Sequence, residues 1–540
     1  MKPLLTLLAA VIFAAEAVAQ TPSLPPATGV IRGRVVGVDG RPVKQVVVRA
    51  LGTTVQMQRG AMTDENGRYE LKDLAADTYT IVINHSRFFA IDAVRRIATD
   101  GRRVRLGRGE ILERVDIAVS PTSAITGRVT DEEGEPVEGA QVQALQLRFV
   151  NGRRQLMEGA RVRATNDLGQ YRLYGLQPGQ YVISVMPATA GTNRLPGYPL
   201  AYYPGTPTLA EAQFVAVEIG RDVSNVDVRL SPGRTARVSG VALAVDGRPL
   251  SGGLIFAGSQ RSGGLTAPPR LIDPQPDGTF TIANVAPGEY VLQSFMSMQG
   301  SQFGSVFVTV GDQDLKDVTL RAMEGSNVTG RVTIEGESAD LRPAFTITPF
   351  PTDFDRAPMM VNTSRASVRS DGTFTMNGLY GPLLFRLGPG APPDWMIKAV
   401  RTGASDVTDT PLMFGRPNQS IDDLEIVLTS RAASISGSVS DGRSQPVTDY
   451  LVIVFATSEK RWYRESRFLK YARAEPDGSF AVRGLPAGDY FVAAVDWMQP
   501  SPGFGEWQDP EVLEALGRRA SRVTLMDGER VQLALKLVPR

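Results

Sequence analysis

The chain has 540 residues, of which 42% are hydrophobic and 21% are charged, a composition typical of a folded rather than a disordered protein. This length exceeds what one ordinary hydrophobic core accommodates and indicates several domains. A formal net charge of +1 provides no bulk attraction to nucleic acid or anionic membranes, and the absence of cysteine excludes disulfides, thiol nucleophiles and thiolate metal ligands.

Residues 1–19 have the pattern of a signal peptide: Lys2, an apolar run from Leu4 to Ala15, and a small-residue cleavage site ending at Ala19. An N-terminal membrane anchor is the alternative, but the run is shorter than the ~20 residues that span a bilayer. No cysteine follows the cleavage site to carry a lipid. We therefore expect an exported protein, periplasmic or extracellular, that is not a lipoprotein and has no transmembrane segment.

A short pattern recurs about every 100 residues, which indicates an array of similar domains. Each copy has a turn glycine, an aromatic residue two positions later, and a second landmark 12 residues after the glycine. These glycine and landmark pairs are Gly67 with Tyr79, Gly169 with Tyr181, Gly278 with Tyr290, Gly372 with Leu384, and Gly478 with Tyr490. We expect the tyrosine rings to lie inside the fold with their hydroxyls at its edge.

Each copy also begins with a strand around a Gly-x-Val sequence, and most continue with an Asp-Gly turn, a proline and strands of alternating polarity. Such alternation, with turns every 8–12 residues, predicts antiparallel β-sandwiches. Helical patterns are scarce: the best is 510–519, capped by Asp509, and a shorter one is 208–212. The fourth copy diverges, since Gly381-Pro382 reverses the usual turn and Leu384 replaces the tyrosine.

These patterns predict an all-β chain with a tandem array of about five β-sandwich modules. The predicted segments are a signal peptide (1–19), a linker (20–28), and sandwiches at 29–120, 121–232, 233–323, 324–429 (divergent) and 430–540.

The succession of Gly-x-Val, Asp-Gly, Pro-Val and the 12-residue landmark resembles the carboxypeptidase regulatory-like domain over residues 29–540. That resemblance implies a transthyretin-like sandwich related to the collagen-adhesin B-type (Cna-B-like) repeat and to carbohydrate-binding-like folds, found in bacterial exported proteins. It is specific for fold and unspecific for function. The zinc site of the peptidase that names the family is absent, because the chain has a single histidine, His85.

Catalytic and metal sites find little support in the sequence. A Ser-His-Asp triad would have to use His85, which follows a strand and is interpreted as a strand-end residue. The acidic run Asp131–Glu135 is interpreted as a solvated hairpin turn, with a calcium site as the alternative. We therefore predict no enzyme activity, no catalytic residues, no metal and no cofactor.

Aromatic residues in the predicted loops are the best candidates for ligand binding, because exposed rings form stacking platforms for sugars or anchors for proteins. The alternative is that these rings pack over sandwich ends or module junctions. The candidate residues are Trp462, Tyr463, Arg464, Phe468, Trp497, Trp507, Tyr202 and Tyr203.

Function is accordingly predicted to be non-catalytic, structural or adhesive, with carbohydrate as the ligand class that the resemblance implies. The partner would be a glycan or polysaccharide, or an envelope protein, and not nucleic acid. The alternative is a protein-partner scaffold or an accessory module of an envelope or secreted peptidase system.

Overall fold

The computed structural model describes residues 28–53, 58–92, 97–99, 101–150, 152–187, 198–233, 235–250, 252–259, 268–294, 302–335, 345–359, 365–416, 419–496 and 505–539. The predicted signal peptide and Trp497 lie outside these ranges. The described residues form two compact units. The five domain limits predicted from the sequence stay a prediction.

The first unit contains the described residues up to Asn84 together with Gly101–Ile117. One of its sheets has the strand order β3-β2-β5-β8, and β1 pairs antiparallel with β4 and parallel with β9. The strands are β1 (Gly29–Gly37), β2 (Val47–Gly52), β3 (Gln58–Met62), β4 (Arg68–Leu74), β5 (Asp77–Asn84), β8 (Arg102–Leu106) and β9 (Ile111–Leu112).

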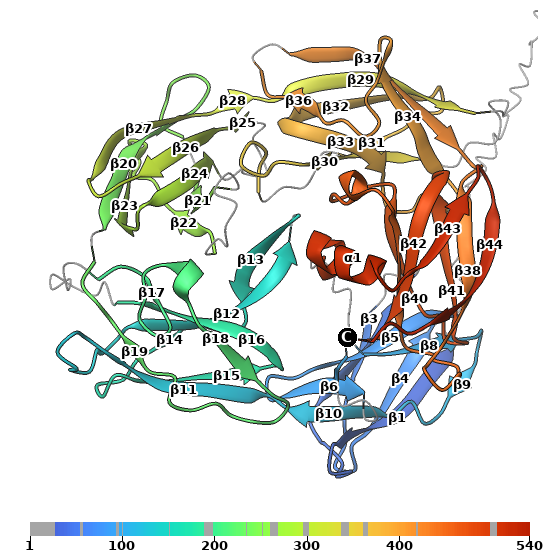
Figure 1. The fold of residues 1–540 in the computed structure, drawn as a ribbon, viewed down its shortest axis with the longest axis horizontal. Helices are drawn as coiled ribbons and strands as arrows, with labels where there is room; N and C mark the ends of the chain where they lie inside the picture. Colours follow the sequence, from blue (N-terminus) through green and yellow to red (C-terminus); the bar gives the residue numbers. More distant parts are fainter. Residues whose placement is uncertain are drawn as a thin grey trace, which may run out of the picture. The chain divides into compact units, whose positions relative to one another are not determined.

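The second unit contains the described residues of His85–Asp100 and Ala118–Arg540. It begins with β6 (Phe88–Asp92), which pairs antiparallel with β7 (Ile97–Ala98) and with β10 (Ile117–Pro121). Four further sets of strands follow, and we call them the second to fifth repeats (Figure 1).

The second repeat comprises β11 (Ser123–Thr130), β12 (Gln141–Val150), β13 (Arg153–Glu158), β14 (Arg163–Ala164), β15 (Gln170–Leu176), β16 (Gly179–Met186), β17 (Ala201–Tyr202), the 3-10 helix η1 (Leu209–Glu211), β18 (Phe214–Val217) and β19 (Val228–Arg229). The third comprises β20 (Ala236–Leu243), β21 (Leu254–Gly258), β22 (Arg270–Ile272), β23 (Thr279–Val285), β24 (Gly288–Ser294), β25 (Gln302–Phe303), β26 (Ser305–Val310), β27 (Leu315–Arg321) and β28 (Met323–Glu324).

The fourth repeat comprises β29 (Ser326–Ile334), β30 (Thr346–Pro351), β31 (Ala366–Ser367), β32 (Thr373–Leu379), β33 (Gly381–Leu387), β34 (Met396–Thr402), β35 (Ser405–Asp406), β36 (Leu412–Phe414) and β37 (Ser420–Thr429). The fifth comprises β38 (Ala433–Ser440), β39 (Leu451–Ala456), η3 (Glu459–Arg461), β40 (Leu469–Arg473), β41 (Ser479–Leu485), β42 (Gly488–Val495), η4 (Glu506–Gln508), α1 (Pro510–Gly517), β43 (Ser521–Leu525) and β44 (Arg530–Lys536). Helix α1 begins as predicted, with the Asp509 carboxylate accepting a hydrogen bond from the Glu511 N–H.

The second to fifth repeats share one topology. The opening strand lies at or near the centre of one sheet, as in β15-β11-β19 and β41-β38-β44, and the second sheet contains an order such as β40-β39-β42-β43. The predicted all-β sandwich is confirmed, but the pairing is not purely antiparallel. The closing strand runs parallel to the opening strand in each of these repeats, because it returns beside that strand from the opposite sheet.

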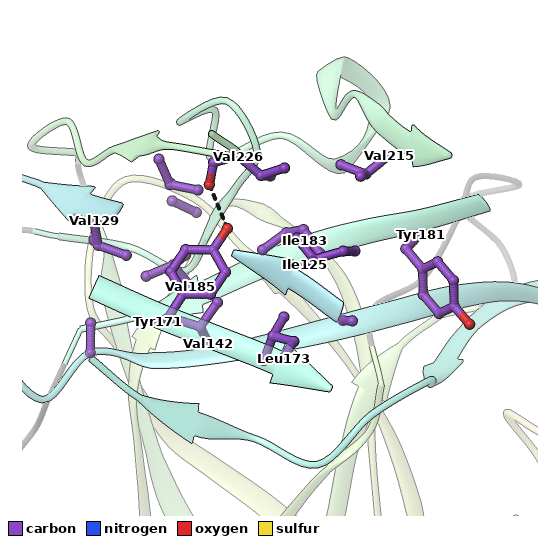
Figure 2. Packing of buried hydrophobic residues seen from close by; sticks show 14 of the residues in the cluster. Ile125, Val129, Val142, Tyr171, Leu173, Tyr181, Ile183, Val185, Val215 and Val226 are labelled. Carbon is purple, nitrogen blue, oxygen red and sulfur yellow. Dashed lines mark hydrogen bonds between the residues drawn. The ribbon is translucent and has the colours of Figure 1, made fainter. Parts of the chain in front are cut away.

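The recurrent glycine of each opening strand is explained by a close backbone approach. A Cβ placed on Gly127 would lie 1.9 Å from the Val226 carbonyl oxygen, and one on Gly33 would lie 2.0 Å from that of Val115. No side chain fits at such distances, so only glycine lets the closing segment lie against the opening strand. Figure 2 shows the core beside this contact, where the Tyr171 hydroxyl donates to the same Val226 oxygen over 2.5 Å.

The tyrosines of the 12-residue pattern have their predicted positions. Tyr79 and Tyr181 are 1% exposed and Tyr490 is fully buried. Each hydroxyl donates to the carbonyl four residues earlier, at 2.9 Å for Tyr79, 2.8 Å for Tyr181, 2.9 Å for Tyr290 and 2.7 Å for Tyr490. The hydroxyl therefore satisfies the carbonyl of the turn that precedes its strand, which fixes the corner between two strands.

After the opening strands β1, β11, β20 and β38, the turn places one residue in the left-handed region, two positions before a proline. Glycine occupies this position at Gly40, Gly134 and Gly247, with φ of +76°, +90° and +81°. In the fifth repeat the residue is Ser444, with φ of +61°, although Gly442 stands nearby. The Asp441-Gly442 pair therefore does not place its glycine where positive φ is needed.

Candidate binding site where the second, fourth and fifth repeats meet

The stretch that holds four of the predicted ligand-binding residues, 460–468, packs against the fourth repeat through Asp409. The Asp409 carboxylate accepts hydrogen bonds from Arg467 Nη2 at 2.6 Å and from the Tyr463 hydroxyl at 3.0 Å. Arg386 Nη2 contacts the same carboxylate at 3.4 Å. These contacts join two repeats by charge-assisted bonds, which are stronger than neutral ones.

Arg386 is buried at this contact, with 7% of its surface exposed. Its guanidinium donates to the carbonyl oxygens of Glu465 at 2.7 Å and Thr408 at 2.9 Å, besides the Asp409 contact. Burial lowers the pKa of Arg386 from its usual value. Burial alone would raise the pKa of Asp409, but the hydrogen bond from Arg467 and the charges of Arg467 and Arg386 outweigh it, so this pKa is lowered. Asp409 is thereby held as the anion.

Two of the predicted aromatic rings belong to the cores of the fifth repeat. Trp462 is 9% exposed, and its indole Nε1 donates to the Ala456 carbonyl at 2.7 Å. Phe468 is 6% exposed, and the guanidinium of Arg461 lies 3.9 Å from its ring centroid. The ring of Phe468 is therefore covered by protein atoms, as the packing alternative expects, and Trp462 leaves only a small exposed edge.

The other predicted aromatics lie elsewhere. Tyr202 is buried against Leu145 and Leu156 of the second repeat, and Tyr203 is partly buried against the adjacent core. Trp507 is partly buried, with its ring centroid 4.7 Å from that of Tyr471. Tyr202 and Tyr203 thus do not join the candidates at positions 462–468, and Trp497 lies outside the described residues.

The hairpin of β12 and β13 contacts the region of α1, which is some 355 residues away in sequence (Figure 1). Arg154 donates from Nε to the Asp509 carboxylate at 2.7 Å and from Nη2 to Glu511 at 2.6 Å. Arg148 forms an ion pair of 2.8 Å with Glu506. Sequence analysis did not find these residues, because nothing in the local pattern links strands so far apart.

A cavity of about 1010 Å³ opens beside these contacts. The second, fourth and fifth repeats all contribute to its walls, and its lining combines rings, aliphatic surface and charged groups. It is lined by Phe149, residues 152–154, Pro351, Thr352, Leu384, Asp409, Pro411, Lys460, residues 462–464 and residues 508–511. Of the predicted residues, Trp462, Tyr463 and Arg464 therefore meet at one site.

Two arginines of this lining have buried N–H groups that find no hydrogen-bond partner among the described residues: Nε and Nη1 of Arg153, and Nη1 of Arg464. Burial lowers the pKa of both side chains. Arg154 is the contrasting neighbour, since its hydrogen bond to Asp509 raises its pKa.

The remaining candidates form no site in the part of the chain that the structure describes. His85 follows β5, and its Nδ1 accepts from the Arg87 N–H at 3.1 Å. In the acidic run, the Asp131 carboxylate accepts from the N–H groups of Glu133 and Glu135, as in a hairpin turn. Among the described residues, no group of acidic and histidine side chains could hold a metal ion, and no helix has the length and hydrophobicity to span a membrane.

The fold and these contacts define a protein of β-sandwich repeats joined by buried polar contacts. Residues 30–118 and 124–231 match the model of the carboxypeptidase regulatory-like domain, which confirms the resemblance in these two segments.

Comparison with curated proteins gives no significant match. Among solved structures, the Bacillus anthracis TIE protein is similar at 9% identity, covering 77% of this chain and 74% of that one, with a TM-score of 0.16. A streptococcal ancillary pilin is similar at 14% identity over 54% and 98% of the two chains, with a TM-score of 0.17. GBS52, the minor pilin of Streptococcus agalactiae, is similar at 14% identity over 38% and 96%, with a TM-score of 0.23. Likeness at this level says nothing about what this chain binds.

Proposed function

We propose that the chain is an exported, non-catalytic binding protein that holds a carbohydrate in the cavity beside Tyr463. The observation that carries the proposal is the cavity itself. Its volume of about 1010 Å³ is large enough for an oligosaccharide, and its lining mixes rings and aliphatic surface with hydrogen-bonding groups. Sugars present the same mixture of apolar ring faces and hydroxyl groups.

Fixed walls favour binding, because a preformed site pays less conformational entropy when the ligand arrives. The Tyr463 hydroxyl is held by Asp409, and another part of the lining is held by the ion pair of Arg154 with Asp509. Both parts of the lining are therefore set before any ligand binds.

The carboxylates of the lining support a non-catalytic role. Asp409 is paired with Arg467, and both Asp509 and Glu511 are paired with Arg154. Glycoside hydrolysis needs one carboxyl group that donates a proton and a second that acts as base or nucleophile. The lowered pKa of Asp409 keeps this carboxylate without a proton at neutral pH, so it is not suited to act as the acid.

A glycan array probed with the chain from residue 20 onward tests the proposal, followed by calorimetry on the glycans that bind. Lys460 and Gln508 line the cavity outside the buried cores, so K460A and Q508A should weaken binding about tenfold without unfolding. The control K536A removes an exposed lysine from β44, outside the cavity, and should bind as the wild type does.

Failure of every glycan to bind would refute the proposal, as would equal effects of K460A and K536A. Recovery of an envelope protein by the chain, without any glycan signal, would favour the protein-scaffold alternative. Trp462 is unsuitable as a test position, because its burial makes W462A a folding variant.

A further inference from the structure

Arg153 and Arg464 bring two guanidinium groups to the cavity from different repeats. Arg153 begins β13, and Arg464 follows η3 in the fifth repeat. The backbones lie close together at this point, since a Cβ placed on Gly152 would lie 3.7 Å from Cβ of Arg464. Glycine at 152, with φ of +79°, allows the tight turn that leads Arg153 into the lining.

The Arg464 side chain lies against a loop of the fourth repeat, and charges on the same loop act on Arg153. The Arg464 guanidinium carbon is 5.1 Å from the ring centroid of Phe354. The carboxylates that act on Arg153 electrostatically are the two neighbours of that ring, Asp355 and Asp353. The two arginines are therefore in the same part of the cavity.

Among the described residues, the acidic groups near these arginines make their short contacts with other residues. Asp353 lies 3.6 Å from Arg356, and Asp355 accepts a 2.7 Å hydrogen bond from the Ser259 hydroxyl. Glu465 reaches Arg464 only at 4.0 Å. In the part of the chain that the structure describes, Nε and Nη1 of Arg153 and Nη1 of Arg464 have no acceptor, and a partly buried cation without one is costly.

The cavity lining as a whole contains more cationic than anionic side chains. Its three carboxylates are each paired with an arginine, whereas three of its cations have, among the described residues, no ion pair closer than the 4.0 Å contact of Arg464 with Glu465. These cations are Arg153, Lys460 and Arg464.

We propose that the ligand of this cavity is an acidic oligosaccharide whose carboxylate groups bind Arg153 and Arg464. This inference rests on the proposed function and names its ligand class. A guanidinium offers a planar pair of donors that matches the two oxygens of a carboxylate. A uronic acid combines that carboxylate with a sugar ring, which the Tyr463 side chain and the aliphatic lining can contact.

The test compares an oligogalacturonide with its methyl ester, which has the same sugar rings but no charge. Calorimetry on the chain from residue 20 onward should show at least tenfold tighter binding of the acid, which corresponds to about 1.4 kcal/mol. This preference should shrink as salt rises, because a charged contact is screened. The variants R153Q and R464Q should lose the preference while still binding the ester, and R518Q, on an exposed arginine outside the cavity, should retain it.

Each alternative outcome is decisive. Equal binding of acid and ester by the wild type would overturn the inference and leave the proposed function standing, whereas failure of both sugars to bind would overturn both. Tighter binding of a sulfated oligosaccharide, or binding of a poly-glutamate peptide without the acid, would also overturn it. The wild-type comparison of acid and ester at two salt concentrations decides the matter even where a variant does not fold.

Discussion

Asp409 should be a main support of the contact between the fourth and fifth repeats, and D409N tests this. Asparagine keeps one acceptor oxygen and the shape of the side chain, but removes the charge that two arginines share. The short bond from Arg467, at 2.6 Å, ends on one carboxylate oxygen and the longer bond from buried Arg386, at 3.4 Å, ends on the other, so the amide of asparagine can accept only one of them, as a neutral acceptor. Each loses about 1 kcal/mol. We expect a loss of about 2 kcal/mol, reduced somewhat because Asp409 is 34% exposed and solvent screens it.

Urea unfolding followed by tryptophan fluorescence measures this loss where it occurs. The four tryptophans, Trp395, Trp462, Trp497 and Trp507, all belong to the segments predicted as the fourth and fifth sandwiches. Their emission therefore reports on these repeats and not on the rest of the chain. A shift of the midpoint without a change in slope indicates a change in stability.

The effect should also depend on pH. The folded-state pKa of Asp409 is lowered, so its contribution is present above the unfolded value of about 3.9 and is lost as pH falls through the lower, folded value. The difference between wild type and D409N should be constant from about pH 7 to 5 and shrink below about pH 4.

The control is D394N in the same repeat. Asp394 lies 3.8 Å from Arg483, and both side chains are about half exposed. Such a surface pair contributes at most about 1 kcal/mol. Equal effects of D409N and D394N, or a D409N effect that persists unchanged at low pH, would refute the role assigned to Asp409.

Three further predictions concern the repeated fold. G127A should destabilise the second repeat by about 3 kcal/mol or prevent its folding, because its Cβ would meet the Val226 carbonyl at 1.9 Å; thermal unfolding tests this. S444G should raise the free energy of unfolding of the fifth repeat by about 1 kcal/mol, measured as a higher urea midpoint, since glycine adopts the φ of +61° without strain; an unchanged midpoint would show that the turn is unstrained. Y490F should cost about 1 to 2 kcal/mol by leaving the Pro486 carbonyl without its 2.7 Å partner, and an unchanged midpoint would contradict that role.

Much of the fold follows from local sequence patterns. Alternating polarity predicts the strands, Asp509 and Pro510 predict the start of α1, and the 12-residue spacing predicts the buried tyrosines. The parallel pairing of closing with opening strands was not predicted, because alternation shows that a segment is a strand but not beside which strand it runs. For the same reason the sequence could not show why position 127 must be glycine, because the residue that approaches it, Val226, is distant in sequence.

The candidate site was predictable only in part. The aromatic residues of the loop around Tyr463 were predicted to bind a ligand, and Trp462 and Tyr463 do line the cavity. Composition could not show that Trp462 and Phe468 face inward, since burial depends on what packs over a loop. Arg153 and Asp409 carried no signal, because each is an ordinary charged residue until the fold brings distant segments beside it.

The pairing of Arg148 with Glu506 spans 358 positions and has a consequence for biogenesis. A ribosome releases the N-terminal residue of that pair long before it makes the C-terminal one, and folding generally proceeds from the N-terminus as domains emerge. Arg148 on β12 must therefore remain in water until translation has passed Glu506. A nascent chain truncated before position 505 would leave Arg148 without this partner, so the cavity forms only after residues 508–511, which line it, have been made.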